Sequence, residues 1–224
     1  MNLLDLVFPK TCLECGRPGS YICSDCVAKV RLARPICPYC EQLTINGTTH
    51  IRCQQKCGLS GLVSIWEYEG VIRKAILALK FRYATEIASL LNFFIVEKLR
   101  TPDSRFTIRG SSILVPIPLH WHRQNVRGFN QSVEVGKSVA SALGWKFEPD
   151  LLIKKQPTVS QMELSGDRRR QNLKDAFVLG PRFKIPDSIT VFDDVFTTGS
   201  TLREAAKVLR MAGVKKVWGL TIAR

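Results

Sequence analysis

The chain has 224 residues, of which 45% are hydrophobic and 23% are charged, and its formal net charge is +14. This composition is that of a globular protein long enough for one substantial domain and a small one. No uncharged apolar run reaches the roughly 18 residues that a membrane-spanning helix needs, which argues against such a helix. The first eight residues include Asp5 and lack a basic leader, so we expect a cytoplasmic chain without a signal peptide.

All eight cysteines precede residue 58 and form four close pairs, and the first three pairs have the spacing C-x-x-C. The pairs are Cys12 and Cys15, Cys23 and Cys26, Cys37 and Cys40, and Cys53 and Cys57. Two thiolates at this spacing can bind one zinc ion from a tight turn, and two such turns complete a tetrahedral site. Disulfides are the alternative, but a chain without a secretion signal lies in a reducing compartment. We therefore expect two structural zinc ions in a zinc-ribbon module at residues 1–60.

The sequence allows two ways of assigning the eight cysteines to two zinc ions. The simplest scheme is sequential, with the first four cysteines around one ion and the last four around the other, and an interleaved scheme is the alternative. His50 is a nitrogen donor that could replace a cysteine in the second site. With four thiolates available there, we expect an ordinary loop histidine. Because the module has few large apolar residues, metal binding would supply most of its stability.

A short basic patch, Lys29, Arg31 and Arg34, lies between the second and third cysteine pairs. Zinc ribbons also bind nucleic acids, so single-stranded DNA is a candidate partner, although a solvated linker is the commoner meaning of such a patch. Two all-cysteine zinc sites would lower the net charge to about +10. The densest basic stretches, 123–127 and 168–170, adjoin expected active-site loops, which favours a highly anionic small molecule as the charge partner.

From Gly61 onward, apolar β-rich runs alternate with amphipathic helical patterns, which predicts an α/β domain at residues 61–224. The expected strands cover 62–68, 113–118, 189–192 and 217–222, and the expected helices cover 71–80, 85–100, 131–143 and 201–212. This order favours a parallel sheet flanked by helices. The long segment at 154–173 has the length of a functional lid or a mobile loop.

The strand at 189–192 ends in two carboxylates, Asp193 and Asp194, and then turns into a helix through hydroxyl residues and a glycine. In a parallel sheet, ligands bind at the carboxyl ends of strands, and the next helix offers unpaired N–H groups to an anion. Carboxylates only accept hydrogen bonds, so sugar hydroxyls are their natural partners. A phosphate suits the following turn, which supplies hydroxyl donors and a close backbone approach at Thr197, Thr198, Gly199, Ser200 and Thr201.

The alternative is a solvated turn in which Thr201 and Glu204 form a capping box. A capping box explains only these two residues, so we favour a bound phosphorylated sugar. A second loop, which follows Pro118, is rich in donors and would face an anion such as pyrophosphate. Its donors are Arg123, Arg127, Asn130 and Gln131, and a solvated basic loop is the competing interpretation.

Residues 193–201 resemble the phosphoribosyl pyrophosphate (PRPP) motif of type I phosphoribosyltransferases. Together with the paired cysteines and the motifs at 125–131, 161–164 and 169–173, they make the chain similar to the ComF/GntX family of competence-associated, phosphoribosyltransferase-like proteins. The resemblance implies a double zinc ribbon joined to a type I phosphoribosyltransferase domain, with a role in DNA uptake, natural transformation or DNA utilisation. DNA-uptake proteins would then be partners. The sequence at 165–167 departs from the more basic version expected in the family, which leaves that loop's partner open.

The resemblance also implies a role for each site residue. Asp193 and Asp194 would be the catalytic pair that binds the ribose 2- and 3-hydroxyls. Mg²⁺ would bind mostly to pyrophosphate, ribose and water oxygens. The 5-phosphate would lie in the loop Val195, Phe196, Thr197, Thr198, Gly199, Ser200 and Thr201. Arg123 and Arg127 would contact pyrophosphate, and Arg169 would act from the lid.

No residue in the sequence identifies a nucleophile or an acceptor, and a phosphate-binding loop alone does not make an enzyme. We therefore weigh three hypotheses: a phosphoribosyltransferase, a non-catalytic PRPP or nucleotide sensor that serves a DNA-handling machine, and a DNA-binding protein led by its zinc ribbons. Release of pyrophosphate from PRPP separates the first two, and salt-dependent DNA binding that requires residues 1–60 marks the third.

Overall fold

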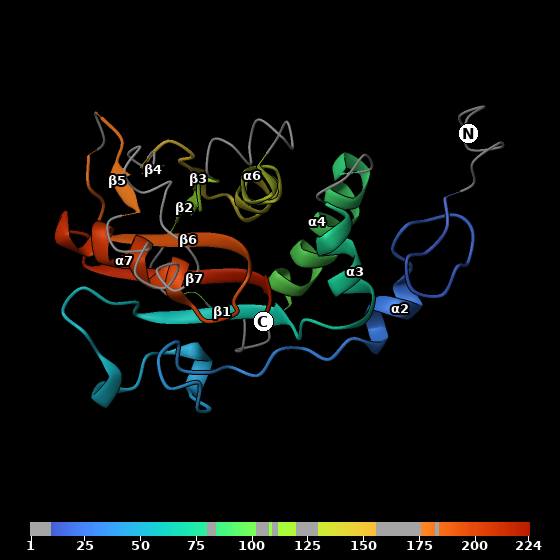
Figure 1. Ribbon diagram of the computed structural model, residues 1–224, viewed down its shortest axis with the longest axis horizontal. Coiled ribbons are helices and arrows are strands. Elements are labelled where there is room, and N and C mark those ends of the chain that lie inside the picture. Colours follow the sequence, from blue (N-terminus) through green and yellow to red (C-terminus); the bar gives the residue numbers. More distant parts are fainter. Residues whose placement is uncertain are drawn as a thin grey trace, which may run out of the picture.

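The computed structural model describes residues 10–79, 84–101, 108, 112–119, 130–155, 176–181 and 184–224. Within these residues the expected α/β class is confirmed, because the main sheet has five parallel strands in the order β1-β7-β6-β2-β3 (Figure 1). The strands are β1 (Gly61–Trp66), β2 (Ile113–Pro116), β3 (Lys146–Phe147), β6 (Ser188–Val195) and β7 (Lys216–Ala223). The longest strands, β6 and β7, are adjacent at the centre of the sheet, where both edges of each strand are paired.

Helices cover both faces of the sheet and produce two hydrophobic cores. One core, with Val63, Phe192 and Leu220 from the sheet, packs against α3 (Gly70–Ala78), α4 (Ala84–Arg100) and α6 (Gln131–Leu143). The other core includes Val191 and Val217, and it packs against α7 (Ser200–Met211). Because neighbouring residues of a strand point to opposite faces, Val191 and Phe192 enter different cores. Burial on both faces explains why the strands read as continuous apolar runs.

The expected helices and long strands are present, with ends that differ by at most three residues. The sequence does not predict β3, nor the antiparallel pair β4 (Leu152–Lys154) and β5 (Phe177–Leu179). Strands of two or three residues are too short to show a period of two. The expected lid at 154–173 begins at the last residue of β4, and beyond residue 155 it lies outside the described residues.

The first part of the cysteine-rich segment, residues 10–60, lies beside α3, and the later part lies along the outer edge of β1 (Figure 1). Ala33 N–H donates to Ile65 O at 2.9 Å, and Glu67 N–H donates to Arg31 O at 2.9 Å. This pairing covers an edge strand that would otherwise expose unpaired backbone groups. Ile22 and Val27 also enter the core with α3 and α4. The segment therefore shares packing with the sheet.

Three short helices form within the cysteine-rich segment: α2 (Ser24–Lys29), η1 (Ile45–Gly47) and η2 (Ile51–Cys53). The first part of the segment contacts α3 through α2, and the second part contacts β1 through η1. Among the described helices, none combines the length and the apolar composition needed to cross a bilayer.

Candidate functional site

The candidate site lies where β6 ends and α7 begins. β6 is a central strand, and its last residues remain in register with β7, with Asp193 opposite Thr221 and Val195 opposite Ala223. Phe196 N–H donates to Ala223 O at 2.9 Å and so directs the chain away from the sheet. Asp193 and Asp194 therefore occupy the carboxyl edge of the sheet, where parallel α/β proteins bind ligands.

The turn into α7 depends on Gly199. Its φ is 70°, in the left-handed region that glycine adopts without strain, and it is the N-cap residue of α7. A Cβ atom at this position would lie 2.5 Å from the Phe196 ring, which is too close for any side chain. Glycine is thus required here both for backbone conformation and for space.

The same turn presents hydrogen-bond donors. The hydroxyls of Thr198 and Ser200 lie 3.0 Å apart, and Ser200 N–H points to Thr198 Oγ1 at 3.4 Å. Within the described part of the chain, the N–H groups of Thr197, Thr198 and Gly199 donate to no acceptor. Hydroxyls and free N–H groups at the start of a helix form an anion-binding surface.

The capping-box alternative is wrong. It would make Thr201 the N-cap, whereas α7 begins at Ser200 with Gly199 as the N-cap, and no side-chain hydrogen bond caps the helix. The left-handed turn at Gly199 places the N-cap two residues earlier than a capping box at Thr201 would. Thr201 therefore lies inside the first turn of α7, beside the hydroxyl-rich loop.

The two carboxylates differ in their surroundings. Asp193 Oδ1 accepts hydrogen bonds from Asp194 N–H at 2.9 Å and from Ser132 Oγ at 3.2 Å. Burial, and then repulsion by the Asp194 carboxylate, raise the pKa of Asp193 to about 7. Asp194 Oδ1 accepts from Val195 N–H at 2.8 Å. Asp193 therefore keeps its proton to higher pH than an exposed aspartate does.

Sequence reasoning missed Ser132, which comes from the first turn of α6. Asn130 caps this helix by accepting from Ser132 N–H at 3.0 Å, and its amide donates to Ile117 O at 3.1 Å, just beyond β2. The cap thus directs Ser132 toward Asp193. An asparagine just before an amphipathic run is a helix-start signal that could locate the cap, but not the contact with Asp193.

The expectation that Asn130 and Gln131 contact pyrophosphate disagrees with their positions. Both side chains are buried. Asn130 is occupied by the cap, and Gln131 Nε2 donates to Leu79 O at 3.5 Å. Their polar groups serve the packing of α6 because they lie on the side that faces the sheet and α3. The other pyrophosphate and lid candidates, Arg123, Arg127 and Arg169, lie outside the described residues.

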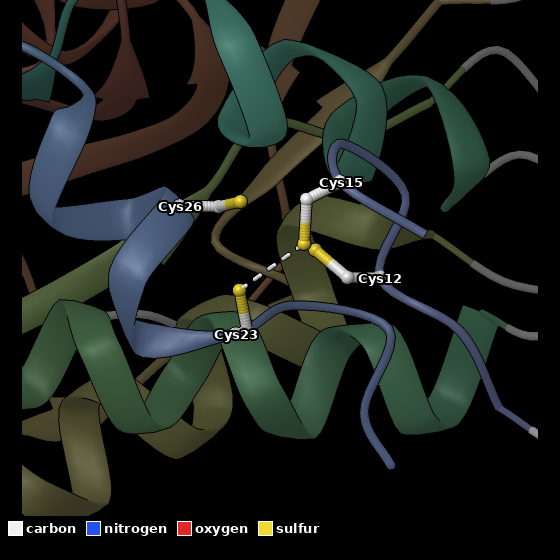
Figure 2. A group of neighbouring side chains, drawn as sticks. All are labelled: Cys12, Cys15, Cys23 and Cys26. Atoms are coloured by element: carbon white, nitrogen blue, oxygen red, sulfur yellow. Dashed lines mark hydrogen bonds between the residues drawn. The ribbon is translucent and has the colours of Figure 1, made fainter. Parts of the chain in front are cut away.

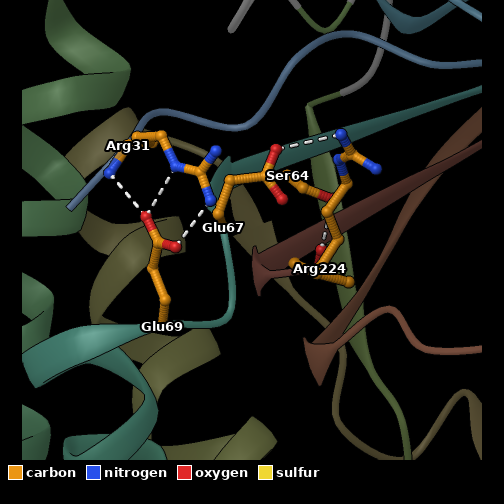
Figure 3. A network of polar contacts seen from close by, with 6 residues as sticks. Arg31, Ser64, Glu67, Glu69 and Arg224 are labelled. Atoms are coloured by element: carbon orange, nitrogen blue, oxygen red, sulfur yellow. Dashed lines mark hydrogen bonds and ion pairs between the residues drawn. The ribbon is translucent and has the colours of Figure 1, made fainter.

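A polar network lies at the same edge of the sheet, beyond the carboxyl ends of β1 and β7 (Figure 3). Arg31 donates to Glu69 through Nε at 2.9 Å and Nη2 at 2.7 Å, and these bonds lower the pKa of Glu69 to about 2. Arg224 donates to Glu67 at 3.0 Å. The network joins the cysteine-rich segment to the start of α3, so Arg31 is not a free cation of the expected basic patch.

The first four cysteines lie together (Figure 2). Their sulfur atoms are all within 4.8 Å of one another, and Cys12 and Cys26 are buried beside the core that includes α3 and α4. The second cluster contains Cys37, Cys40, His50 and Cys53, again with donor atoms within 4.8 Å. Both donor sets suit tetrahedral Zn²⁺, which supports the expected structural zinc and a sequential grouping.

Cys57 is not part of the second cluster, which therefore differs from the expected group of four cysteines. The cluster contains His50 instead, and His50-Ile-Arg-Cys53 has the same spacing as a C-x-x-C pair and forms the tight turn at η2. Cys57 follows this turn at a spacing of four residues from Cys53. The sequence contains a signal for this grouping, since an H-x-x-C pair is equivalent in spacing to the other three pairs.

Comparisons with known proteins agree with this arrangement. Residues 3–58 match the double zinc ribbon domain family. The DNA utilization protein YhgH of Salmonella typhimurium is 30% identical over 226 residues, which cover 96% of this chain and 98% of the relative. The competence protein F of Haemophilus influenzae is 30% identical over 208 residues, with 90% of each chain covered. The competence protein ComFC of Streptococcus pneumoniae is 26% identical over 210 residues, and this alignment covers 92% of this chain and 88% of the relative.

Among solved structures, the adenine phosphoribosyltransferase of Leishmania tarentolae is 15% identical in sequence. The match covers 61% of this chain and 71% of that chain, with a TM-score of 0.29. This value is too low to support a structural argument. The full-length sequence relatives carry the assignment instead, because their alignments extend from the cysteine clusters through the loop at the end of β6. On this basis the chain belongs to the ComF/GntX family.

Proposed function

We propose that the site at the end of β6 binds PRPP and that the protein acts as a phosphoribosyltransferase-like component of DNA uptake or DNA utilisation. The observation that carries this proposal is the juxtaposition of two carboxylates, Asp193 and Asp194, with the hydroxyls of Thr198 and Ser200 and with the N–H groups of residues 197–199, which have no acceptor among the described residues. Acceptors for sugar hydroxyls and donors for a phosphate are thus separated by only a few residues, as a phosphorylated pentose requires.

In this assignment each part of the ligand meets matching chemistry. The 5-phosphate accepts from the N–H groups of Thr197, Thr198 and Gly199 and from the hydroxyls of Thr198 and Ser200. The ribose hydroxyls donate to the carboxylates of Asp193 and Asp194. Arg123, Arg127 and Arg169 are proposed to neutralise the pyrophosphate. Bound Mg²⁺ would supply further charge neutralisation to the pyrophosphate oxygens.

Transfer would break the bond between ribose C1 and the pyrophosphate oxygen, and the bonding electron pair would leave with pyrophosphate. An acceptor lone pair would then form the new bond to C1 from the opposite face. In such a reaction the protein contributes mainly orientation and charge stabilisation. Asp193 and Asp194 would fix the ribose, and the loop at 197–201 would fix the opposite end of the sugar.

The relatives named for competence and DNA utilisation support the proposed biological role. Incoming single-stranded DNA, DNA-uptake proteins or nucleotides derived from that DNA are the partners that this role implies. The basic character of the chain, with a formal net charge of +14 before metal binding, is consistent with anionic partners of either kind.

A thermal unfolding series tests the binding proposal. PRPP with Mg²⁺ should raise the unfolding temperature in a concentration-dependent manner, since a ligand at 100 times its Kd stabilises a protein by about 2.7 kcal/mol. Ribose 5-phosphate, which retains the sugar and 5-phosphate, should produce a weaker shift, and the Thr198→Ala/Ser200→Ala variant should reduce both shifts. A shift with pyrophosphate alone that equals the shift with PRPP would contradict a site built around the pentose.

Release of pyrophosphate from PRPP in the presence of a panel of bases and amines separates enzyme from sensor. An acceptor-dependent release that requires Asp193 and Asp194 identifies a transferase. Binding of PRPP without release across the panel leaves the non-catalytic sensor as the function of the same site.

A further inference from the structure

We propose that His50 is the fourth ligand of the second zinc ion, through Nδ1, and that Cys57 does not bind the metal. The site would therefore be of the Cys₃His type, while the first site is of the Cys₄ type. Nδ1 of His50 lies 3.3 Å from Cys40 Sγ, and the donor atoms of Cys37, Cys40, His50 and Cys53 are all within 4.8 Å. This is the separation expected of donors arranged around one ion.

The other ring nitrogen of His50 supports the same assignment. Nε2 lies 3.2 Å from the backbone carbonyl oxygen of Leu43. A carbonyl oxygen can only accept, so Nε2 must carry the hydrogen of this bond. In the neutral ring, Nδ1 then has a free lone pair, and it is the nitrogen that faces the thiolates. Metal-binding histidines usually have this arrangement, in which a backbone carbonyl fixes the tautomer and the orientation of the ring.

The local backbone places His50 and Cys53 on the same tight turn. Cys53 N–H donates to His50 O at 2.8 Å, which closes the turn at η2. Two ligands from a turn of this kind complement the pair Cys37 and Cys40, where Glu41 N–H donates to Cys37 O at 3.0 Å. The second site is therefore built from two short turns, as a zinc ribbon requires.

Cys57 lies beyond this unit. A separate turn, closed by Gly58 N–H donating to Gln55 O at 3.0 Å, carries it away from Cys53. Its side chain is half-buried, and it is absent from the group of converging donors. Replacement of one thiolate by a neutral imidazole gives the second site one negative charge fewer than a Cys₄ site. The two zinc ions of this chain would thus differ in electrostatics and in ligand chemistry.

Four versions of the full chain test the proposal: the natural protein, His50→Ala, His50→Cys and Cys57→Ser. Zinc content is measured after equilibration with a competing chelator, so that weakened binding is detected. We expect Cys57→Ser to retain as much zinc as the natural chain and His50→Ala to lose about half of the bound zinc. His50→Cys should restore retention, because its spacing recreates a C-x-x-C pair.

Two further readouts do not depend on the stability of His50→Ala. After Co²⁺ replaces Zn²⁺, His50→Cys should increase the thiolate-to-metal charge-transfer absorption, whereas Cys57→Ser should leave it unchanged. In the zinc-loaded natural chain, mass spectrometry after brief alkylation should find modification at Cys57 and protection of the other seven cysteines. Loss of zinc or of charge-transfer absorption in Cys57→Ser would overturn the proposal, as would full zinc retention by His50→Ala.

Discussion

Arg203 on α7 donates through Nε to the backbone carbonyl oxygen of Pro38 at 3.0 Å, although 165 residues separate the two in sequence. The guanidinium also lies over the ring of Tyr39, 5.1 Å from its centroid. Pro38 and Tyr39 are the two residues between Cys37 and Cys40, so they belong to the second cysteine cluster. Arg203 N–H donates to Gly199 O at 2.9 Å. One residue therefore joins the second zinc cluster to the proposed phosphate loop.

Replacement of Arg203 should test this connection. Arg203→Lys keeps the charge but loses the planar group that both reaches Pro38 and covers Tyr39. We expect a loss of about 1 to 2 kcal/mol in the free energy of unfolding, measured by urea denaturation of the zinc-loaded chain. PRPP should also bind several-fold more weakly, with unchanged zinc content. Arg73→Lys is the matched control, because the Arg73 guanidinium on α3 lies over the Tyr68 ring, 5.9 Å from its centroid, and Tyr68 is not part of the second cysteine cluster. Equal effects of the two substitutions would contradict a specific role for Arg203.

Substitutions at Gly199 and Gly144 can separate the effect of backbone strain from that of a steric clash. Their φ angles are 70° and 67°, but a Cβ at Gly199 would meet the Phe196 ring at 2.5 Å, whereas a Cβ at Gly144 would have nothing within 4 Å. Both Gly→Ala variants should lose about 1 kcal/mol of stability from strain. Gly199→Ala should lose more and should also weaken PRPP binding. The free energy of unfolding and the affinity for PRPP should be measured in both variants. Equal losses of stability would show that the Phe196 ring moves away from the new Cβ at no cost.

The pH dependence of stability should report on Asp193. Its pKa is about 7 in the folded protein and near 3.8 when the chain is unfolded. Between these pH values the folded state keeps the proton on Asp193, whereas the unfolded state has lost it. The free energy of unfolding therefore falls as pH rises from about 4 to about 7, and it stays lowered by this group above pH 7. Asp193→Asn removes the titration. Urea denaturation should therefore find this variant stabilised relative to the natural chain mainly at pH 8, with a difference that shrinks toward pH 4.

Ser132 gives an independent check on the same carboxyl. The hydroxyl of Ser132 donates to Asp193 and lowers its pKa, in opposition to the larger effect of burial. Ser132→Ala should move the pH profile of PRPP binding to higher pH, because ionised Asp193 is the better acceptor for ribose hydroxyls. Ser138→Ala, on the exposed side of α6, should not move it. Identical profiles for Ser132→Ala and the natural chain would contradict the assigned contact.

Zinc removal should loosen the sheet as well as the cysteine-rich segment. The segment pairs with β1 through Ala33 and Arg31, and it contributes Ile22 and Val27 to the core beside α3. Hydrogen–deuterium exchange of the chelated protein should therefore rise in β1 as well as in residues 10–60. An increase confined to residues 10–60 would show that the two parts are energetically independent.

The sequence predicts those parts of the molecule whose structure depends on residues that are close together in the sequence. The loop at 193–201 is recognisable because an apolar strand, two acids, hydroxyls and Gly199 follow one another directly. Three C-x-x-C pairs indicate zinc in the same way. Ser132 and Arg203 were not predictable, since their contacts with Asp193 and Pro38 cross 61 and 165 residues and depend on the packing of α6 and α7.

Two details of the structure depend on tight turns. The capping box at Thr201, which was the alternative to a bound phosphate, does not form because the left-handed conformation of Gly199 starts the helix earlier. The sequence pairs Cys57 with Cys53 because thiolates are preferred zinc ligands, whereas the donor atoms that lie together in the structure include His50, whose spacing from Cys53 matches that of the other pairs. In both cases a tight turn determined the outcome.

Calorimetric titration of the zinc-loaded chain with PRPP and Mg²⁺ tests the central claim most directly, with the natural protein compared to Asp193→Asn/Asp194→Asn. Asp187→Asn is the control, because Asp187 precedes the opposite end of β6 and its side chain is 81% exposed. We predict saturable binding to the natural chain and to Asp187→Asn, and affinity at least about tenfold weaker in the double variant, which corresponds to a loss of roughly 1.4 kcal/mol or more. Unchanged PRPP affinity in the double variant, or no PRPP binding by the natural chain, would contradict the account.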